Sequence, residues 1–569
     1  MTRPSAGLPR SGFLAALPLV VVAAAASLPA AEPERARPPR AAGYSFVFKD
    51  VGDGAGIFPH AAGIRGHGAA WGDADGDGWP DLFVATFHNR GSKPGVFLHN
   101  EKGKFRPDDQ EHLRTTGIGS GALFVDLTNS GRLDLYVSNC DYGRKGVQPV
   151  PSYLFRNDGG GKFTDVSKES GACPPGYEGR GLAALDFDGD GLLDLVTCEQ
   201  YYSPEAKTGP ALYRNQGNHR FEDVAKATGM PPGLGGLGVA AADVNNDGWP
   251  DIFLTSGAGD HRLLLNDGKG KFREPPGARE VFLWTTDRDD DPPAGVCIVD
   301  VNRDGLPDVV IGHHFKSPWT TPAPIRLYLN RGVKDGVPSF EDVTEDAGLK
   351  PLAMKAPHVE VQDFDNDGWP DIYVSIVKFA DGKPCPVIYK NLGVRDGVPR
   401  FREDAWAVND FPTAEDVALK RSGPLFDKIL EEKKIIYMAA APSCDFDRDG
   451  RIDLFLANWW VESRSLLLRN ETPGGDWLDV RIEGRDGVNR MGIGAKVNVY
   501  PAGKLGQAPA LLGSREICIG YGYCSGQEAV AHFGLGAEGT VDVEVILPRG
   551  KGTLMRRGVK ANQVLTVKR

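Results

Sequence analysis

The sequence predicts an all-β protein, a seven-bladed β-propeller closed by an N-terminal strand and followed by a small C-terminal β-sandwich domain. Three observations support this fold class: an acidic nine-residue motif recurs along the chain, two strand-like motifs follow it, and turns are very frequent. The 569 residues include 73 glycines and 42 prolines, which argues against a helical bundle. With 41% hydrophobic residues, the chain has enough apolar side chains to form a core.

The acidic motif reads Asp-x-Asp/Asn-x-Asp-Gly-x-x-Asp, and its positions are numbered 1 to 9 below. Successive copies start 53 to 82 residues apart, so each unit has room for the four short strands of a propeller blade. In the first unit, the inner strand is expected at 69–72 and the second strand at 81–85. The copies begin at Asp73, Asp186, Asp243, Asp300, Asp363 and Asp445, with a degenerate copy at Asp126.

Two further motifs predict the third and fourth strands of each blade. An apolar run ends in Asn at Asn100, Asn157, Asn215, Asn266, Asn330, Asn391 and Asn470. A short strand with Phe follows at Phe105, Phe163, Phe221, Phe272, Phe340 and Phe401. The seventh Phe strand is missing after Asn470, but a matching segment, 48–51, precedes the first unit. This offset predicts that the N-terminal strand completes the last blade and leaves no open sheet edge.

The acidic loops predict about six structural calcium sites. Alternating side chains at positions 1, 3 and 5 converge, Gly at position 6 permits a sharp turn, and Asp at position 9 completes the set. Oxygen ligands without His or Cys suit Ca²⁺ better than Zn²⁺. With the position-7 carbonyl included, the expected ligands are Asp73, Asp75, Asp77, Trp79, Asp81; Asp186, Asp188, Asp190, Leu192, Asp194; Asp243, Asn245, Asp247, Trp249, Asp251; Asp300, Asn302, Asp304, Leu306, Asp308; Asp363, Asp365, Asp367, Trp369, Asp371; and Asp445, Asp447, Asp449, Arg451, Asp453.

Two other interpretations of these loops fit the sequence less well. An EF-hand requires Glu at position 12, where this chain has apolar or Thr residues that belong to the next strand. Asp, Asn and Gly also form good hairpin turns without any metal, but repeated clusters of carboxylates would repel one another in the absence of a cation. The degenerate second loop has Asp126, Thr128, Ser130 and Asp134, and is therefore expected to be a plain turn.

The N-terminal segment predicts an exported protein, and the net charge argues against nucleic acid as a partner. The net charge of −11 makes nucleic acid an improbable partner. Residues 1–31 resemble a signal peptide, with Arg3 and Arg10 around an apolar stretch, and 32–43 form a Pro-rich linker. We therefore expect a secreted or periplasmic protein without a membrane span after signal cleavage. Six Ca²⁺ ions would nearly neutralise the remaining chain, whose net charge is −13 once both arginines are removed.

A second domain is expected at 476–569, after a propeller at 44–470. Alternating apolar residues predict strands at 477–482, 496–500, 516–519, 541–547 and 564–567. Cys518 and Cys524 flank a Gly-Tyr-Gly-Tyr segment that could form a hairpin tip. His532 is expected to be a packed residue at a strand end.

The acidic loops and their spacing resemble FG-GAP/VCBS repeats, the repeats of integrin α-chain propellers and of many exported bacterial proteins, over about residues 44–470. This resemblance implies Ca²⁺ in the hairpin between the first two strands of a blade. The C-terminal segments Gly492–Ala495, Gly520–Tyr523, His532–Gly536, Pro548–Gly550 and Asn562–Gln563 resemble the ASPIC/UnbV domain. Leu547 and Arg549 depart from the Trp and Ser that are usual there, and Cys524 and Gly526 depart in the Gly-Tyr segment.

No nucleophile or phosphate-binding motif is present, so no catalytic residue is assigned. The loops opposite the acidic hairpins carry aromatic and cationic residues that could stack on sugars: Tyr201, Tyr202, His313, His314, Trp319, Trp459, Trp460, Arg180 and Lys355. A helical insertion at 413–434 lengthens the last interval. We expect a binding or adhesion module for an extracellular protein or glycan; the alternative is a calcium-dependent, lyase-like polysaccharide enzyme on the same scaffold.

Overall fold

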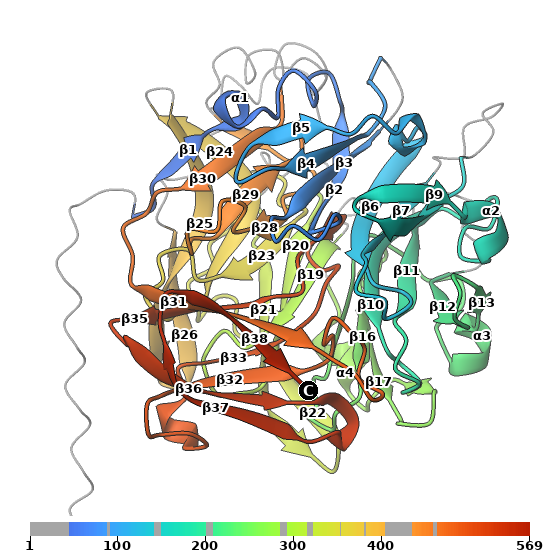
Figure 1. Cartoon of the computed structure of the whole chain (residues 1–569). Helices are drawn as coiled ribbons and strands as arrows, with labels where there is room; N and C mark the ends of the chain where they lie inside the picture. Colours follow the sequence, from blue (N-terminus) through green and yellow to red (C-terminus); the bar gives the residue numbers. More distant parts are fainter. Residues whose placement is uncertain are drawn as a thin grey trace, which may run out of the picture. The chain divides into compact units, whose positions relative to one another are not determined.

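A computed structural model describes residues 45–87, 91–140, 150–200, 209–284, 293–315, 322–352, 354–380, 383–403, 435–458 and 464–569. The expected signal peptide, the linker and the insertion at 413–434 lie outside these residues. Within the described part, seven four-stranded antiparallel arrays follow one another along the chain and form the blades of a β-propeller, as predicted (Figure 1). Each acidic loop joins the first and second strands of its blade.

The blades are numbered along the chain. Blades 1 to 3 comprise β2 (Gly66–Gly72), β3 (Asp81–Thr86), β4 (Val96–Asn100) and β5 (Phe105–Pro107); β6 (Ile118–Val125), β7 (Asp134–Cys140), β8 (Tyr153–Gly159) and β9 (Lys162–Asp165); β10 (Gly179–Leu185), β11 (Asp194–Gln200), β12 (Ala211–Asn215) and β13 (Phe221–Asp223). Blades 4 and 5 comprise β15 (Val239–Ala242), β16 (Asp251–Leu254), β17 (Arg262–Asn266) and β18 (Phe272–Arg273); β19 (Pro293–Val299), β20 (Asp308–His313), β21 (Arg326–Lys334) and β22 (Val337–Asp342).

Blades 6 and 7 complete the ring. They comprise β23 (Val359–Gln362), β24 (Asp371–Ala380), β25 (Lys383–Arg395) and β26 (Val398–Glu403); β28 (Ser443–Cys444), β29 (Asp453–Leu456), β30 (Leu466–Asn470) and β1 (Phe48–Asp50). Short elements between and beside the blades are β14 (Gly235–Gly236), β27 (Ile435–Tyr437), α1 (Gly52–Ala55), α2 (Ser167–Ser170), α3 (Ala225–Thr228), α4 (Ala278–Val281) and η1 (Glu111–Leu113).

The N-terminal strand closes the ring. β1 pairs antiparallel with β30, with Phe48 opposite Asn470 and Asp50 opposite Leu468. The fourth strand of blade 7 therefore comes from the other end of the propeller sequence, as the motif offset predicts. Figure 1 shows β1, in blue, beside the orange β30. The pairing covers the edge of β30 that would otherwise expose unpaired backbone groups.

The motif asparagines join each blade to the one before it. In every blade the Asn side-chain amide donates a hydrogen bond to a carbonyl at position 2 of the preceding acidic loop, over 2.7 to 3.0 Å. Asn100 of blade 1 reaches the carbonyl of Phe446 in blade 7, so the same contact also bridges the closure. Because these asparagines are almost fully buried, their side chains can satisfy backbone groups that water does not reach.

Two sheets form the C-terminal domain, as predicted. One has the order β35-β31-β38 and the other the order β33-β32-β36-β37 (orange to red in Figure 1). The strands are β31 (Asp476–Glu483), β32 (Lys496–Pro501), β33 (Gly513–Glu516), β35 (Ala531–Gly536), β36 (Thr540–Ile546), β37 (Thr553–Lys560) and β38 (Gln563–Lys568), with short helices η3 (Ala508–Ala510) and η4 (Pro548–Gly550). We predicted a strand at 516–519, but β33 ends at Glu516.

That strand ends early because the chain turns into the propeller. Gly522 bridges Val296 on the inner strand of blade 5, and β34 (Ser525–Gly526) pairs in parallel with β2 of blade 1. The backbone NH of Tyr523 donates to Nδ1 of His358, 3.0 Å away, beside the inner strand of blade 6. We call the segment 520–526 the axial segment. Our prediction that this segment forms a hairpin tip is therefore wrong, and Cys518 and Cys524 are free thiols.

Candidate metal centres

Each acidic loop is first of all a tight hydrogen-bonded turn. The position-1 carboxylate accepts a hydrogen bond from the backbone NH of the position-6 glycine in all seven loops, over 2.6 to 3.0 Å. That glycine has a positive φ, for example +90° at Gly248, which other residues rarely adopt. The degenerate second loop makes the same turn around Asp126, so the turn itself does not require carboxylates at positions 3 and 5.

The position-9 aspartate has a structural role in every loop. One carboxylate oxygen accepts the backbone NH of the motif Asn, over 2.7 to 2.9 Å. The other accepts the NH of position 2, over 3.0 to 3.4 Å. Asp134 makes both bonds in the second loop, which explains why that loop keeps this aspartate after losing the other acidic positions.

Carboxylates from different positions of one loop, positions 1 and 9 included, converge as expected for a cation site. In blades 1, 3, 6 and 7, three carboxylates of one loop have ligand atoms within 4.8 Å of one another, at Asp73, Asp75 and Asp77; Asp186, Asp188 and Asp194; Asp363, Asp365 and Asp371; and Asp445, Asp447 and Asp453. Burial raises the pKa of Asp194, Asp251 and Asp308 well above the usual carboxyl range, and neighbouring carboxylates raise it further. An oxygen-only donor set of this kind fits Ca²⁺.

The residue before each motif Asn varies with the charge of its loop. The four loops with Asp at position 3 are followed by a basic or imidazole side chain, namely His99, Arg214, Lys390 and Arg469. The two loops with Asn at position 3 are followed by Leu265 and Leu329. Among these six acidic loops, the third strand supplies a basic or imidazole side chain only where the loop has four carboxylates. The degenerate second loop is also followed by a basic residue, Arg156, but its Nε pairs with Asp158 at 2.7 Å. This relation could have been found in the sequence, but we did not predict it.

Lys390 contacts three carboxylates of its loop. Its Nζ lies 2.6 Å from Oδ1 of Asp365, 2.8 Å from Oδ2 of Asp367 and 3.5 Å from Oδ1 of Asp371. Burial disfavours the ammonium ion, but the three aspartates outweigh this effect and raise the pKa of Lys390 above its usual value. Arg214 instead lies near the rim of its loop, with Nε 2.5 Å from Asp188 and the side chain 45% exposed.

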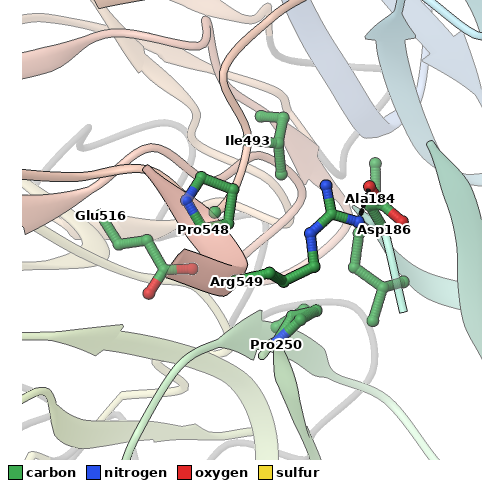
Figure 2. A pocket seen from close by; sticks show the side chains of 10 residues that line it. Ala184, Asp186, Pro250, Ile493, Glu516, Pro548 and Arg549 are labelled. Atoms are coloured by element: carbon green, nitrogen blue, oxygen red, sulfur yellow. Dashed lines mark ion pairs between the residues drawn. The ribbon is translucent and has the colours of Figure 1, made fainter. Parts of the chain in front are cut away.

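The C-terminal domain contacts the acidic loops directly. Arg549, which follows Pro548 in η4, enters the third loop and places Nη1 2.6 Å from Oδ2 of Asp186. Figure 2 shows this side chain extending over Pro250 to Asp186, while Glu516 lies on the other side of Pro548. The Glu516 carboxylate accepts the backbone NH of Asp243 in the fourth loop at 2.9 Å. One domain therefore bridges two adjacent blades.

Every other loop meets the same domain. The contacts are Asn129 Oδ1 with the NH of Arg490, 2.6 Å; Arg303 Nε with the carbonyl of Leu512, 2.5 Å; Asn366 Oδ1 with His532 Nε2, 2.9 Å; and Arg448 with Glu528, 2.8 Å. In the first loop, Asp73 lines a cavity of about 280 Å³ together with Arg481 and Arg490. The acidic-loop face is therefore the docking face of the C-terminal domain.

Part of the predicted ligand surface lies outside the described residues, namely Tyr201, Tyr202, Trp319, Trp459 and Trp460. His314 is described and is half-buried. Arg180, His313 and Lys355, which we expected at an exposed rim, are buried instead. Arg180 Nη1 lies 3.0 Å from His67, whose other ring nitrogen lies 3.2 Å from the hydroxyl of Tyr523. The axial segment thus places Arg180 in the core.

His532 is also buried, with Nδ1 2.7 Å from Asp479 and Nε2 2.9 Å from Asn366. Nδ1 is thus held within the C-terminal domain by Asp479 of β31, and Nε2 joins the domain to the acidic loop of blade 6. This geometry agrees with the structural role that we expected for this residue.

Fold and site together define a seven-bladed β-propeller with acidic inter-strand loops and a C-terminal β domain docked on them. An FG-GAP-like repeat model matches residues 73–137, 143–197, 202–254, 243–311 and 300–374, and an ASPIC and UnbV model matches residues 485–569. The chain belongs to the family of FG-GAP-like repeat proteins with an ASPIC/UnbV domain.

Curated relatives extend the likeness over both domains. Cartilage acidic protein 1 of Homo sapiens is 26% identical over 88% of this chain and 71% of its own length. The Mus musculus protein of that name is 26% identical over 88% of this chain and 73% of its own length.

Solved structures with a related arrangement are more distant. The BP39L lectin from Burkholderia pseudomallei is 12% identical, with a TM-score of 0.39, over 69% of this chain and 93% of its own. The rhamnogalacturonan lyase PL11 of Bacillus licheniformis is 14% identical, with a TM-score of 0.35, over 71% of each chain. At these scores the likeness says nothing about function. No described helix is long and apolar enough to cross a membrane.

Proposed function

We propose that this protein is an exported, calcium-stabilised binding or adhesion module whose partner is an extracellular protein or glycan. The observation that carries the proposal is the docking of the C-terminal domain on the acidic loops of the propeller. A partner that approaches the propeller ring meets the opposite face, where the second and third strands of each blade are joined.

Several features of the chain support a partner on that opposite face. The inner strands run towards the acidic loops, so the ends of β11, β20 and β29 lie away from them. In the sequence, Tyr201 and Tyr202 follow β11, Trp319 follows β20, and Trp459 and Trp460 follow β29. Aromatic rings are effective anchors for sugars and for protein side chains. With Arg180 and Lys355 buried, aromatic contact rather than charge is the basis of the proposal.

Export is supported by the N-terminal segment around Arg3 and Arg10 and by the cartilage association in the name of the relatives. Calcium is supported by the oxygen-only loops. Bound Ca²⁺ would neutralise carboxylates that otherwise repel one another at the face that holds the C-terminal domain. A cation that binds the folded loops more tightly than the unfolded chain stabilises the fold by mass action.

The calcium proposal predicts that chelation lowers the melting temperature and that added Ca²⁺ restores it. Differential scanning fluorimetry with a chelator, with Ca²⁺ and with Mg²⁺ measures this effect, while metal analysis of the dialysed protein gives the calcium content. Mg²⁺ is the matched control, because it demands a smaller octahedral site. An unchanged melting temperature, together with no bound metal, would contradict the proposal.

The binding proposal is tested with glycan and matrix-protein arrays, probed with and without Ca²⁺. On any ligand found, the Trp459→Ala, Trp460→Ala double variant should bind at least tenfold more weakly at an unchanged melting temperature, because aromatic anchors contribute roughly 2 kcal/mol or more each. A variant that melts earlier would show that these tryptophans are core residues instead. Unsaturated sugar products from a bound polysaccharide would favour the lyase-like alternative.

A further inference from the structure

The acidic loop of blade 6 differs from the other loops in its surroundings. The Lys390 ammonium lies within 2.8 Å of the carboxylates at positions 3 and 5 and 3.5 Å from that at position 9. These are three of the four side chains that a bound calcium would share in this loop. The Lys390 side chain is only 3% exposed, so it is not a surface residue that happens to face an acidic patch.

The equivalent residues of the other blades do not occupy their loops in this way. His99 Nδ1 lies 3.5 Å from Asp75 and 3.7 Å from Asp81, while its Nε2 is bonded to Asp108 at 2.7 Å. Arg214 and Arg469 are 45% and 35% exposed and pair with Asp188 and Glu471. In blades 4 and 5 the position is leucine. Arg549 also enters the blade 3 loop, but it pairs there with the carboxylate of Asp186 at position 1, 2.6 Å away. Among the described loops, blade 6 alone has a buried ammonium group among its carboxylates at positions 3, 5 and 9.

The C-terminal domain and the segment leading into it also enclose this loop. The carbonyl of Asp365 accepts the NH of Gly475, and the carbonyl of Asn366 accepts the NH of Gly536 at 2.9 Å. The Asn366 side chain is held by His532. Asp363, Asp365 and Asp371 are buried, and the position-5 residue Asp367 is half-buried, whereas position 5 is exposed in blades 1, 3, 4 and 5. Water that could hydrate either a released ammonium group or an entering ion is therefore largely excluded here.

We infer that the Lys390 ammonium is the resident cation of the blade 6 loop and that this loop binds no calcium. The inference rests on the proposed calcium role of the other loops. Calcium requires six to eight oxygens at about 2.3 to 2.6 Å, so it competes with Nζ for the same carboxylate oxygens. Moving Lys390 aside would leave a buried ammonium without its partners, which is strongly unfavourable. Five loops, rather than six, remain for calcium.

The test is to rebuild the blade 6 loop in the pattern of blade 5. Lys390→Leu with Asp365→Asn reproduces the combination of Leu329 and Asn302 and leaves three carboxylates without an internal cation. Native mass spectrometry and metal analysis count Ca²⁺ per chain. We expect five in the wild type and six in the double variant, and the double variant should lose more thermal stability in chelator. An unchanged count in the folded double variant would overturn the inference.

A second pair of variants decides the question even if the double variant does not fold. Asp367→Ala and Asp190→Ala remove the position-5 carboxylate from blades 6 and 3 respectively. We expect Asp190→Ala to lose one Ca²⁺ and Asp367→Ala to lose none; a loss of one from Asp367→Ala would overturn the inference. A wild type that binds no Ca²⁺ contradicts the calcium proposal instead. In that case a gain of one ion in the double variant still supports the role of Lys390, and no gain contradicts both.

Discussion

In six of the seven blades the motif asparagine satisfies three backbone groups with one side chain, and Asn330 of blade 5 satisfies two. In Asn100, Nδ2 donates to the carbonyls of Pro80 and Phe446, both at 2.9 Å, and Oδ1 accepts the NH of Gly103 at 2.7 Å. Two of these bonds shape its own blade and the third reaches blade 7. Only an amide side chain offers donors and an acceptor at this length, which explains why Asn recurs at this position in all seven blades.

We therefore expect Asn100→Ala to lower the free energy of unfolding by about 3 kcal/mol or more, because each buried backbone group left without a partner costs about 1 to 3 kcal/mol. Asn100→Asp is the matched variant: it keeps the acceptor for Gly103 but loses both donor bonds and adds a buried charge. Denaturant unfolding measures both variants. If either variant unfolds like the wild type, the role of Asn100 as a link between blades is wrong.

At the scale of elements, the closure of the ring depends on β1. Two backbone hydrogen bonds extend its pairing with β30. The Val51 NH donates to the carbonyl of Leu467, and the Glu471 NH donates to the carbonyl of Val47. The side chains of Phe46 and Phe48 pack on Phe364 of blade 6, with ring centroids 6.5 and 6.2 Å apart. The strand thus fills a space between two blades as well as covering a sheet edge.

Deleting residues 41–53 should consequently lower the melting temperature and promote aggregation, because blade 7 keeps three strands and β30 becomes an exposed edge. Cutting only residues 32–40 is the control, and it should leave stability unchanged. Thermal unfolding and light scattering at matched concentrations distinguish the two truncations. Equal stability of both would mean that the ring does not require its N-terminal strand.

At the scale of the whole molecule, the two domains share a core. A continuous cluster of buried side chains includes Leu195 and Tyr213 of blade 3 together with Leu478 and Val543 of the C-terminal domain. The axial segment also connects the C-terminal domain to the inner strands of the propeller. There the Glu360 carboxylate, which is fully buried, meets His358 Nε2 at 3.0 Å and Gln527 Nε2 at 3.1 Å. A buried polar network of this kind fixes one docked position, because partial displacement leaves its members unsatisfied.

Gly522→Ala tests whether the axial segment must insert between the inner strands for the two domains to stay joined. A Cβ there would overlap the His358 ring and lie 2.8 Å from the carbonyl oxygen of Val359. We expect a lower melting temperature and faster proteolysis within residues 471–475. Gly506→Ala is the matched control, since its φ of +76° is close to the +73° of Gly522 and no heavy atom lies within 4 Å of the added carbon. Equal effects of both variants would mean that backbone strain, not the insertion of the axial segment, accounts for the loss.

The blade count, the closure and most strands could be predicted from the sequence, because they depend on local hydrogen bonding and on spacing. Asp at positions 1 and 9 and Gly at position 6 form each turn from within the loop, and alternation of apolar residues predicts the strands beside it. The same local chemistry explains why acidic loops are ambiguous in sequence: the turn in the second loop forms around Asp126 and Asp134 without the carboxylates a cation would need.

Only the tertiary structure decided which face the C-terminal domain covers, where Gly520–Tyr523 goes and which loop receives an ammonium group. Arg549 lies far along the chain from Asp186, and Tyr523 from His67, so no spacing rule brings them together. Burial then changes the chemistry of the residues involved, because a charge removed from water must find a partner within the protein. That is why Arg180 became a core residue and why Lys390 and its aspartates form one buried unit.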